Sequence, residues 1–238
     1  TNLAIALRQE TGQSVALIDT EPNFGDVAVI MDIVDVAPEQ TFSEVALYSD
    51  HLDRDSVTDY LIPHRTGVMV LPSTTQISHW RRPAPSQLQK AVRLIAQTHD
   101  YVVLDTPAGL NELTVAALES SSLILLITSL EIASVKDAML ALELMNSWSF
   151  PPDKVKLTIN CVNSPNGAKL EDLKLVLEHE IFWRIPYDPT ANACSQVGQP
   201  VLLAYPEAKI SQSITELALA ISGLGGKRKA PAFLARWK

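Results

Sequence analysis

The chain has 238 residues, of which 47% are hydrophobic and 19% charged, and its formal net charge is −8. This composition predicts one soluble α/β domain with a sizeable core. The negative charge excludes bulk attraction to nucleic acid or to an anionic membrane. No apolar run reaches the 18 residues of a membrane span. Two cysteines without CxxC or zinc spacing indicate a reducing cytoplasm and small, buried or partly buried thiols.

Short apolar runs rich in β-branched residues alternate along the chain with stretches of helical periodicity. This alternation predicts βα units that build a mostly parallel sheet with helices on both faces. The predicted strands are Val15–Asp19, Val68–Leu71, Tyr101–Asp105, Leu123–Thr128, Val155–Asn160 and Ile181–Pro186. Apolar stripes at helical spacing run through Leu3–Leu7, Leu88–Ile95, Val135–Met145, Leu170–Leu177 and Ile210–Ile221.

Two of the predicted strands end in an acidic residue that is followed by a turn. Tyr101–Asp105 delivers the carboxylate of Asp105, and Val15–Asp19 delivers that of Asp19. In a phosphoryl-transfer site, such an Asp helps to hold Mg²⁺, and the turn after it senses the γ-phosphate. The alternative for Asp105 is a cap on the helix that begins near Asn111. Two strand-end acids favour the phosphoryl-transfer interpretation.

These segments resemble the switch regions of ParA/MinD-type (deviant-Walker) P-loop ATPases, the first switch at residues 16–26 and the second at 103–109. The run Asn23–Ala28 is similar to the Gln-Phe-Gly-Asp-Val-Ala run of CpaE/TadZ pilus-assembly ATPases. The opening Asn2–Leu7 resembles the helix that follows their P-loop. The resemblance extends to about Ser222 and implies a three-layer, P-loop NTPase-type α/β fold.

The resemblance also implies catalytic roles for three acids and a sensing role for one turn. Asp105 would hold Mg²⁺ through water, Glu21 would handle the attacking water, and Asp19 would assist or only cap. Pro107 and Gly109 would belong to the second switch. The family residue at the position of Glu21 is usually Asp, and a base must lie within roughly 2.6–3.2 Å of its proton. The longer Glu therefore favours slow or absent hydrolysis.

For the nucleobase, the resemblance implies a site at the ends of the last two predicted strands. Asn160 would read the adenine edge, and Pro186 and Asp188 would flank the base. From the residues alone, the pattern favours Asn160 as a turn former, which remains the alternative.

The Gly-rich phosphate-binding loop of these ATPases is not found in this sequence. Gly225-Gly226-Lys227 is followed by Arg228 where the loop requires Ser or Thr. We expect the first, central strand and the P-loop to be missing, so that the chain as it stands keeps the fold but cannot use ATP. Loss of a central strand predicts unpaired backbone edges and low stability.

The expected organisation is an N-terminally truncated ATPase domain, residues 1–222, and a flexible basic tail, residues 223–238. The resemblance implies a homodimeric Mg-ATP switch, which binds ATP or ADP and positions a pilus or secretion apparatus. The alternatives are a non-hydrolysing localisation scaffold of the same fold and a ParA-type DNA-partitioning ATPase. We expect a cytoplasmic protein, peripheral at the inner face of the membrane if residues 227–238 make a weak membrane or DNA contact.

Overall fold

The computed structural model describes residues 1–224 except 75, 77–80, 149, 152 and 163–178. The apolar stripe at Leu170–Leu177 and nearly all of the basic tail therefore lie outside the described residues. No described helix is long and apolar enough to cross a membrane.

The first sheet contains the first three predicted strands and one short additional strand, β2. Its order is β2-β3-β1-β4, with β1 paired parallel to both β3 and β4 and the short β2 antiparallel to β3. The strands are β1 (Val15–Asp19), β2 (Ile62–Pro63), β3 (Val68–Leu71) and β4 (Tyr101–Asp105). β1 is buried along its whole length, as a strand covered on both faces must be.

The second sheet contains the remaining three strands, all parallel, in the order β5-β6-β7. They are β5 (Ile124–Thr128), β6 (Val155–Val162) and β7 (Ile181–Pro186). β6 extends two residues beyond the predicted end at Asn160, and its pairing with β7 shifts register twice. Cys161 lies in this irregular stretch with a φ of 55° and is exposed, so the expectation of a buried thiol holds for Cys194 and is wrong for Cys161.

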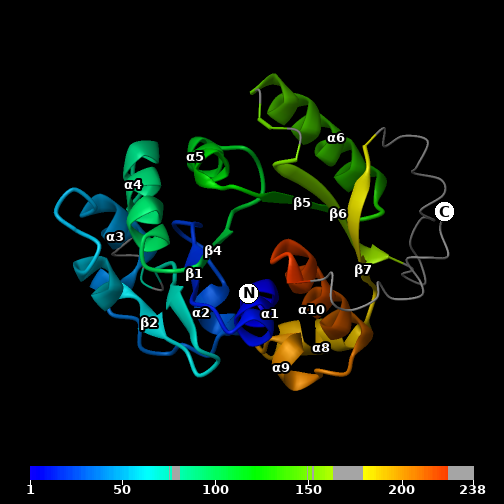
Figure 1. Ribbon diagram of the computed structural model, residues 1–238, viewed down its shortest axis with the longest axis horizontal. Coiled ribbons are helices and arrows are strands. Elements are labelled where there is room, and N and C mark those ends of the chain that lie inside the picture. Colours follow the sequence, from blue (N-terminus) through cyan, green and yellow to red (C-terminus); the bar gives the residue numbers. More distant parts are fainter. Residues whose placement is uncertain (75, 77–80, 149, 152, 163–178, 225–238) are drawn as a thin grey trace.

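Helices cover the first sheet on both faces (Figure 1). One apolar cluster joins α1, the α8–α9 region and α10 to β1 and β3, and another joins α3, α4 and α5 to the opposite face. The α-helices are α1 (Asn2–Thr11), α2 (Val27–Ile30), α3 (Phe42–Leu47), α4 (Pro85–Ala96), α5 (Glu112–Ser120), α6 (Ile132–Ser147), α8 (Pro189–Gln196), α9 (Val201–Ala204) and α10 (Lys209–Ile221). Two 3₁₀ turns are η1 (Pro38–Gln40) and η2 (Ser56–Tyr60). The three-layer α/β architecture is confirmed.

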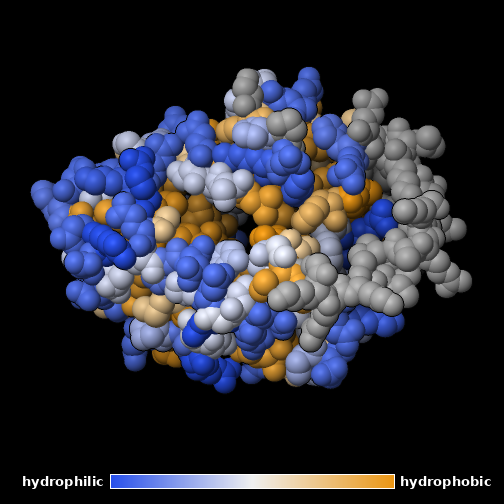
Figure 2. Space-filling model, viewed as in Figure 1, coloured by the Kyte–Doolittle hydropathy of each residue, from blue (hydrophilic) through white to orange (hydrophobic). Residues whose placement is uncertain are grey.

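The strands form two sheets where the sequence predicts one. β4 and β5 end the two sheets and lie next to each other in Figure 1, without strand pairing between them. Figure 2 shows a hollow between them, bordered by hydrophobic residues. Their side chains are only partly covered: Val103 and Leu104 are half-buried, and Ile127 is 59% exposed. α5 packs against both sheets, because its residues join the apolar clusters of each.

Candidate functional site

The two strand-end acids lie side by side. β1 and β4 are parallel neighbours, and their register pairs Asp19 with Asp105. Thr20 joins the two strand ends, since its amide and its hydroxyl donate to the Asp105 carbonyl oxygen at 2.9 and 2.7 Å. Parallel strands present their carboxyl ends at one edge of the sheet, where ligands of open α/β folds bind. The sequence-predicted pair is therefore brought together at this edge.

Asp19 is enclosed by the loop that follows it. Its side chain is almost fully buried and accepts hydrogen bonds from the amides of Glu21 at 3.1 Å and Val27 at 3.2 Å. Burial raises the pKa of Asp19 to about 7; the two amide hydrogen bonds oppose this shift, and the negative charges of Asp105 and Glu21 add to it. Asp19 thus organises the first switch loop and changes its charge near neutral pH.

Gly25 packs directly on Asp19. A Cβ at Gly25 would lie 2.1 Å from the Asp19 Oδ2 and 2.5 Å from the Cβ of Ser73, the residue that follows β3 by two positions. Neither distance is possible between real atoms, so only glycine fits. Ser73 is itself buried and its hydroxyl has no hydrogen-bond partner among the described residues. The sequence analysis did not single out Ser73, although the polar pair Ser73-Thr74 soon after an apolar strand could have indicated it.

Gly25→Ala is expected to lower the free energy of unfolding by about 1–3 kcal/mol, because the added methyl group must displace Asp19 or Ser73. Urea unfolding measures the change. Asp26→Ala, at the exposed neighbouring position of the same loop, is the control, because it adds no atom beside Asp19. A Gly25→Ala chain as stable as the parent would contradict the close packing.

Glu21 and Asp105 present their carboxylates differently. Glu21 is half-buried, and its Oε1 accepts the amide of Asn23 at 3.1 Å, so the side chain folds back on its own loop. Asp105 is exposed at the end of β4. Its alternative role as a helix cap is wrong, because Asn111 caps α5 by accepting the amides of Leu113 and Thr114. The Asp105 carboxylate is therefore left available to a ligand.

The second switch segment runs from the end of β4 to the start of α5. It includes Pro107 and Gly109, and Gly109 has a φ of 90° with open space around its Cα. A left-handed glycine in open space gives this loop room to change conformation. The loop thus has the freedom that a γ-phosphate sensor needs.

The residues expected to contact the base belong to the second sheet. Asn160 is half-buried on β6, and Pro186 ends β7, where the Tyr187 amide donates to the Val162 carbonyl oxygen at 2.8 Å. Asn160 and Pro186 therefore lie on neighbouring strands near the same strand ends. They belong to a different sheet from Asp19 and Asp105.

Asp188 links the starts of two helices. It caps α8, because its Oδ1 accepts the Thr190 amide at 3.0 Å and the Thr190 hydroxyl at 2.6 Å. These bonds, with smaller contributions from the amides of Ile210 and Lys209 at the start of α10, hold the pKa of Asp188 below its usual value. The side chain is thus committed to holding α8 and α10 together.

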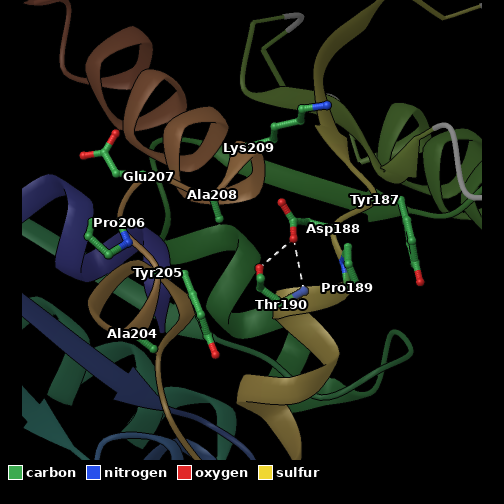
Figure 3. A pocket seen from close by; sticks show the side chains of 10 residues that line it. All are labelled: Tyr187, Asp188, Pro189, Thr190, Ala204, Tyr205, Pro206, Glu207, Ala208 and Lys209. Carbon is green, nitrogen blue, oxygen red and sulfur yellow. Dashed lines mark hydrogen bonds between the residues drawn. The ribbon is translucent and has the colours of Figure 1, made fainter.

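An open hollow of about 590 Å³ lies beside Asp188 (Figure 3). Its walls come from the β7–α8 turn and from the segment between α9 and α10. The sequence analysis did not predict a contribution from the second of these segments. The lining residues are Tyr187, Asp188, Pro189, Thr190, Ala204, Tyr205, Pro206, Glu207, Ala208 and Lys209. Of the residues expected to contact the base, only Asp188 lines it; Asn160 and Pro186 do not.

The carboxylates suit a magnesium ion that is bound mainly by the phosphates of a nucleotide and by water. Among the described residues, no group of three or more His, Cys, Asp or Glu could hold a metal ion. Mg²⁺ is usually bound through one or two carboxylates, together with water and substrate phosphates. The exposed carboxylate of Asp105, with Asp19 behind it, matches that donor set.

Parallel strands, helices on both faces and paired acids at the strand ends match the class of P-loop NTPase folds. The sequence model of a family described as "AAA domain" (AAA_31) matches residues 1–147. The chain therefore belongs to that AAA-domain family, within the ParA/MinD ATPase superfamily.

Known proteins resemble this chain along nearly its whole length. An uncharacterized ATP-binding protein of Methanocaldococcus jannaschii is 23% identical and aligns with 99% of this chain and 88% of its own. The crystal structure of a ParA family ATPase from Chlorobium tepidum superposes with a TM-score of 0.81 at 22% identity, over 92% of this chain and 90% of that one. MinD of Pyrococcus horikoshii, solved with Mg-ADP, gives 0.79 at 22% identity, over 96% and 91%. These structures confirm the fold.

Proposed function

We propose that the intact protein is a Mg-ATP-dependent, dimerising switch ATPase that positions a pilus or secretion apparatus. The observation that supports it most is the pair Asp19 and Asp105, in register at one sheet edge and each followed by a loop. Such a site couples nucleotide state to loop conformation, which is what a positioning switch needs. The similarity of residues 23–28 to CpaE/TadZ ATPases favours pilus assembly.

Each acid has a separate role in this proposal. Bound Mg-ATP supplies the transferable phosphoryl group and the charge that neutralises its oxygens. Asp105 would hold the magnesium ion through water, and Glu21 would orient the attacking water once its bond to the Asn23 amide is released. Asp19 keeps the first switch loop in place through the amides of Glu21 and Val27.

Base recognition in this proposal uses the ends of β6 and β7. The Asn160 side chain reads the adenine edge, since its amide group can both donate and accept. Pro186 and the turn capped by Asp188 flank the base. Asp188 contributes by fixing the turn, because its Oδ1 accepts both the amide and the hydroxyl of Thr190.

A non-hydrolysing scaffold of the same fold is the second candidate. One observation favours it: the Glu21 carboxylate is tied to its own loop at 3.1 Å from the Asn23 amide. A general base must be free to reach a water. In that case nucleotide would bind and shape the dimer surface without turnover.

A DNA-partitioning role is less well supported than either of these. The net charge of −8 opposes phosphate binding, and five basic residues between Lys227 and Lys238 form the clearest basic stretch. A cytoplasmic location is part of the proposal, and residues 227–238 would supply any weak contact with a membrane or with DNA.

The test is binding of a fluorescent ATP analogue with Mg²⁺, comparing this chain with one extended upstream through any phosphate-binding loop encoded there. We expect tight binding and turnover only in the extended chain. In that chain, Asp105→Asn should weaken Mg²⁺-dependent binding or turnover by about 10–100-fold, as for residues that orient metal-bound water. Exposed Asp137→Asn, on α6, is the matched control.

The outcomes separate the candidates. Binding without turnover in the extended chain would favour the scaffold. Equal binding by the Asp105→Asn chain and its parent would remove Asp105 from the magnesium site. Tight ATP binding by the present chain alone would contradict the expectation that it lacks its phosphate site.

A further inference from the structure

The hydroxyl group of Ser73 is buried beside the Asp19 carboxylate and is not used there. Ser73 is 2% exposed, and its Oγ forms no hydrogen bond within the described part of the chain. Folded proteins rarely bury a hydroxyl group without a partner, because its lost hydration is then not replaced. The Ser73 hydroxyl is therefore a donor that the present arrangement of the site leaves free.

Gly25 keeps the hydroxyl and the carboxylate next to each other. The Asp19 Oδ2 and the Ser73 Cβ lie 2.1 and 2.5 Å from the point that a Cβ of Gly25 would occupy, so both side chains use the volume that glycine leaves open. The two atoms are therefore within about 5 Å of each other, a gap that rotation about χ1 of Ser73 and a small shift of the loop can close to hydrogen-bonding distance.

The two oxygen atoms of Asp19 are held by different ends of the first switch loop. Oδ1 accepts the Glu21 amide at 3.1 Å, near the start of the loop, and Oδ2 accepts the Val27 amide at 3.2 Å, where α2 begins. Amides in the first turn of a helix have no partner within the helix, so a displaced Val27 amide can bind water instead. The Asp19 carboxylate is buried at the end of β1, and its Oδ2 then needs another donor.

The hydroxyl groups that adjoin Asp19 and Ser73 in the sequence are already in use. The Thr20 hydroxyl donates to the Asp105 carbonyl oxygen at 2.7 Å. The Thr74 hydroxyl donates to the Gln76 carbonyl oxygen at 3.3 Å and accepts the amide of the same residue at 3.2 Å. Ser73 is the one of these three described residues whose hydroxyl is free to bind Oδ2.

We infer that Ser73 is a positioning residue of the first switch, whose hydroxyl replaces the Val27 amide on the Asp19 Oδ2 when the loop before α2 opens. Oδ2 binds the Val27 amide in the closed loop and the Ser73 hydroxyl in the open one. The buried carboxylate thus keeps a donor in both states, which makes opening easier. The exchange needs no nucleotide, whereas its use to report nucleotide state rests on the proposed function.

This role predicts an effect of opposite sign to that of a structural hydroxyl. In the closed loop the hydroxyl has no partner, so Ser73→Ala should leave the chain as stable as the parent or more stable. In the open loop the same replacement leaves Oδ2 without a donor. Opening should therefore become about tenfold rarer, which corresponds to about 1.4 kcal/mol.

Native-state hydrogen exchange of the ¹⁵N-labelled full chain, without nucleotide, measures this opening, because the Val27 amide exchanges only after its bond to Asp19 breaks. In the parent, we expect Val27 to exchange faster than Leu17, which lies in the buried middle of β1 and reports global unfolding. Ser73→Ala should slow the exchange of Val27 about tenfold. Ser49→Ala is the matched control and should leave it unchanged, since Ser49 is also buried with an unpaired hydroxyl but follows α3.

Three outcomes would overturn the inference. Val27 exchange that is unchanged or faster in Ser73→Ala would show that the hydroxyl is idle or holds the loop closed through water. Val27 and Leu17 amides that exchange together would show that the loop opens only when the chain unfolds. Equal slowing by Ser49→Ala would show a general effect of removing a hydroxyl. Because nucleotide is absent, none of these results bears on ATP binding, which the fluorescent analogue tests separately.

Discussion

Asp19→Asn is expected to stabilise the protein by about 2–3 kcal/mol at pH 8 and to change its stability little at pH 4. The folded-state pKa of Asp19 is about 7, above the ordinary value of 3.8 for this side chain. A carboxyl group with a raised pKa contributes stability that is present below pH 4 and is lost as the pH rises to 7. The full pKa shift corresponds to about 4 kcal/mol of unfolding free energy at high pH. Asn recovers only part of this stability, because it has one acceptor oxygen fewer than Asp for the two amides. Urea unfolding from pH 4 to pH 8 measures the difference.

Asp26→Asn is the control for this prediction, because Asp26 is exposed at the end of the same loop. Unfolding of this variant over the same pH range measures the effect of removing any one carboxylate from the loop. If Asp19→Asn followed the parent at every pH, Asp19 would be an ordinary ionised carboxylate in the folded protein. The proposal that it changes charge near neutrality would then be wrong.

A parallel strand placed between β4 and β5 is expected to raise the free energy of unfolding by about 4 kcal/mol. It would pair two open backbone edges and cover four half-covered side chains, at about 1 kcal/mol each: Val103, Leu104, Leu126 and Ile127. We would test this with a chain extended upstream of Thr1, whose added residues are expected to form such a strand. Urea unfolding of both chains measures the gain.

Two prolines in the added strand give the matched control, since proline cannot pair in a central strand. The control chain should be no more stable than the present one. A present chain that melts cooperatively well above room temperature, without gain from the extension, would show that the two sheets are complete as they stand.

Strand positions were largely predictable because they depend on local pattern. The bounds Val15–Asp19, Val68–Leu71, Tyr101–Asp105 and Ile181–Pro186 match the structure residue for residue. Each is a run of apolar residues closed by a polar or turn residue, and this signal needs no knowledge of neighbours. The sequence predicted unpaired backbone edges but not the division into two sheets. Strand pairing depends on contacts between segments that are distant in the sequence.

The residues of the candidate site could be predicted only where the residue type and its position in the sequence together indicate a role. Asp19 and Asp105 stand at strand ends in the sequence, and parallel pairing brings them together. Ser73 had only a weak signal and Lys209 had none, because their places depend on how Gly25 packs and where α10 begins. The cap of α5 shows the same limit: the sequence offered Asp105 as a cap, and the structure has Asn111 in that role.

Thr20 determines where the motion of the two switch loops can begin. Its amide and hydroxyl both bind the Asp105 carbonyl oxygen, so the last residues of β1 and β4 are held as one rigid body. Rearrangement in either loop therefore starts beyond this point, at Glu21 in one and at Thr106 in the other. Because both loops start from the same pair of joined strand ends, they can respond to one ligand without straining β1 and β4.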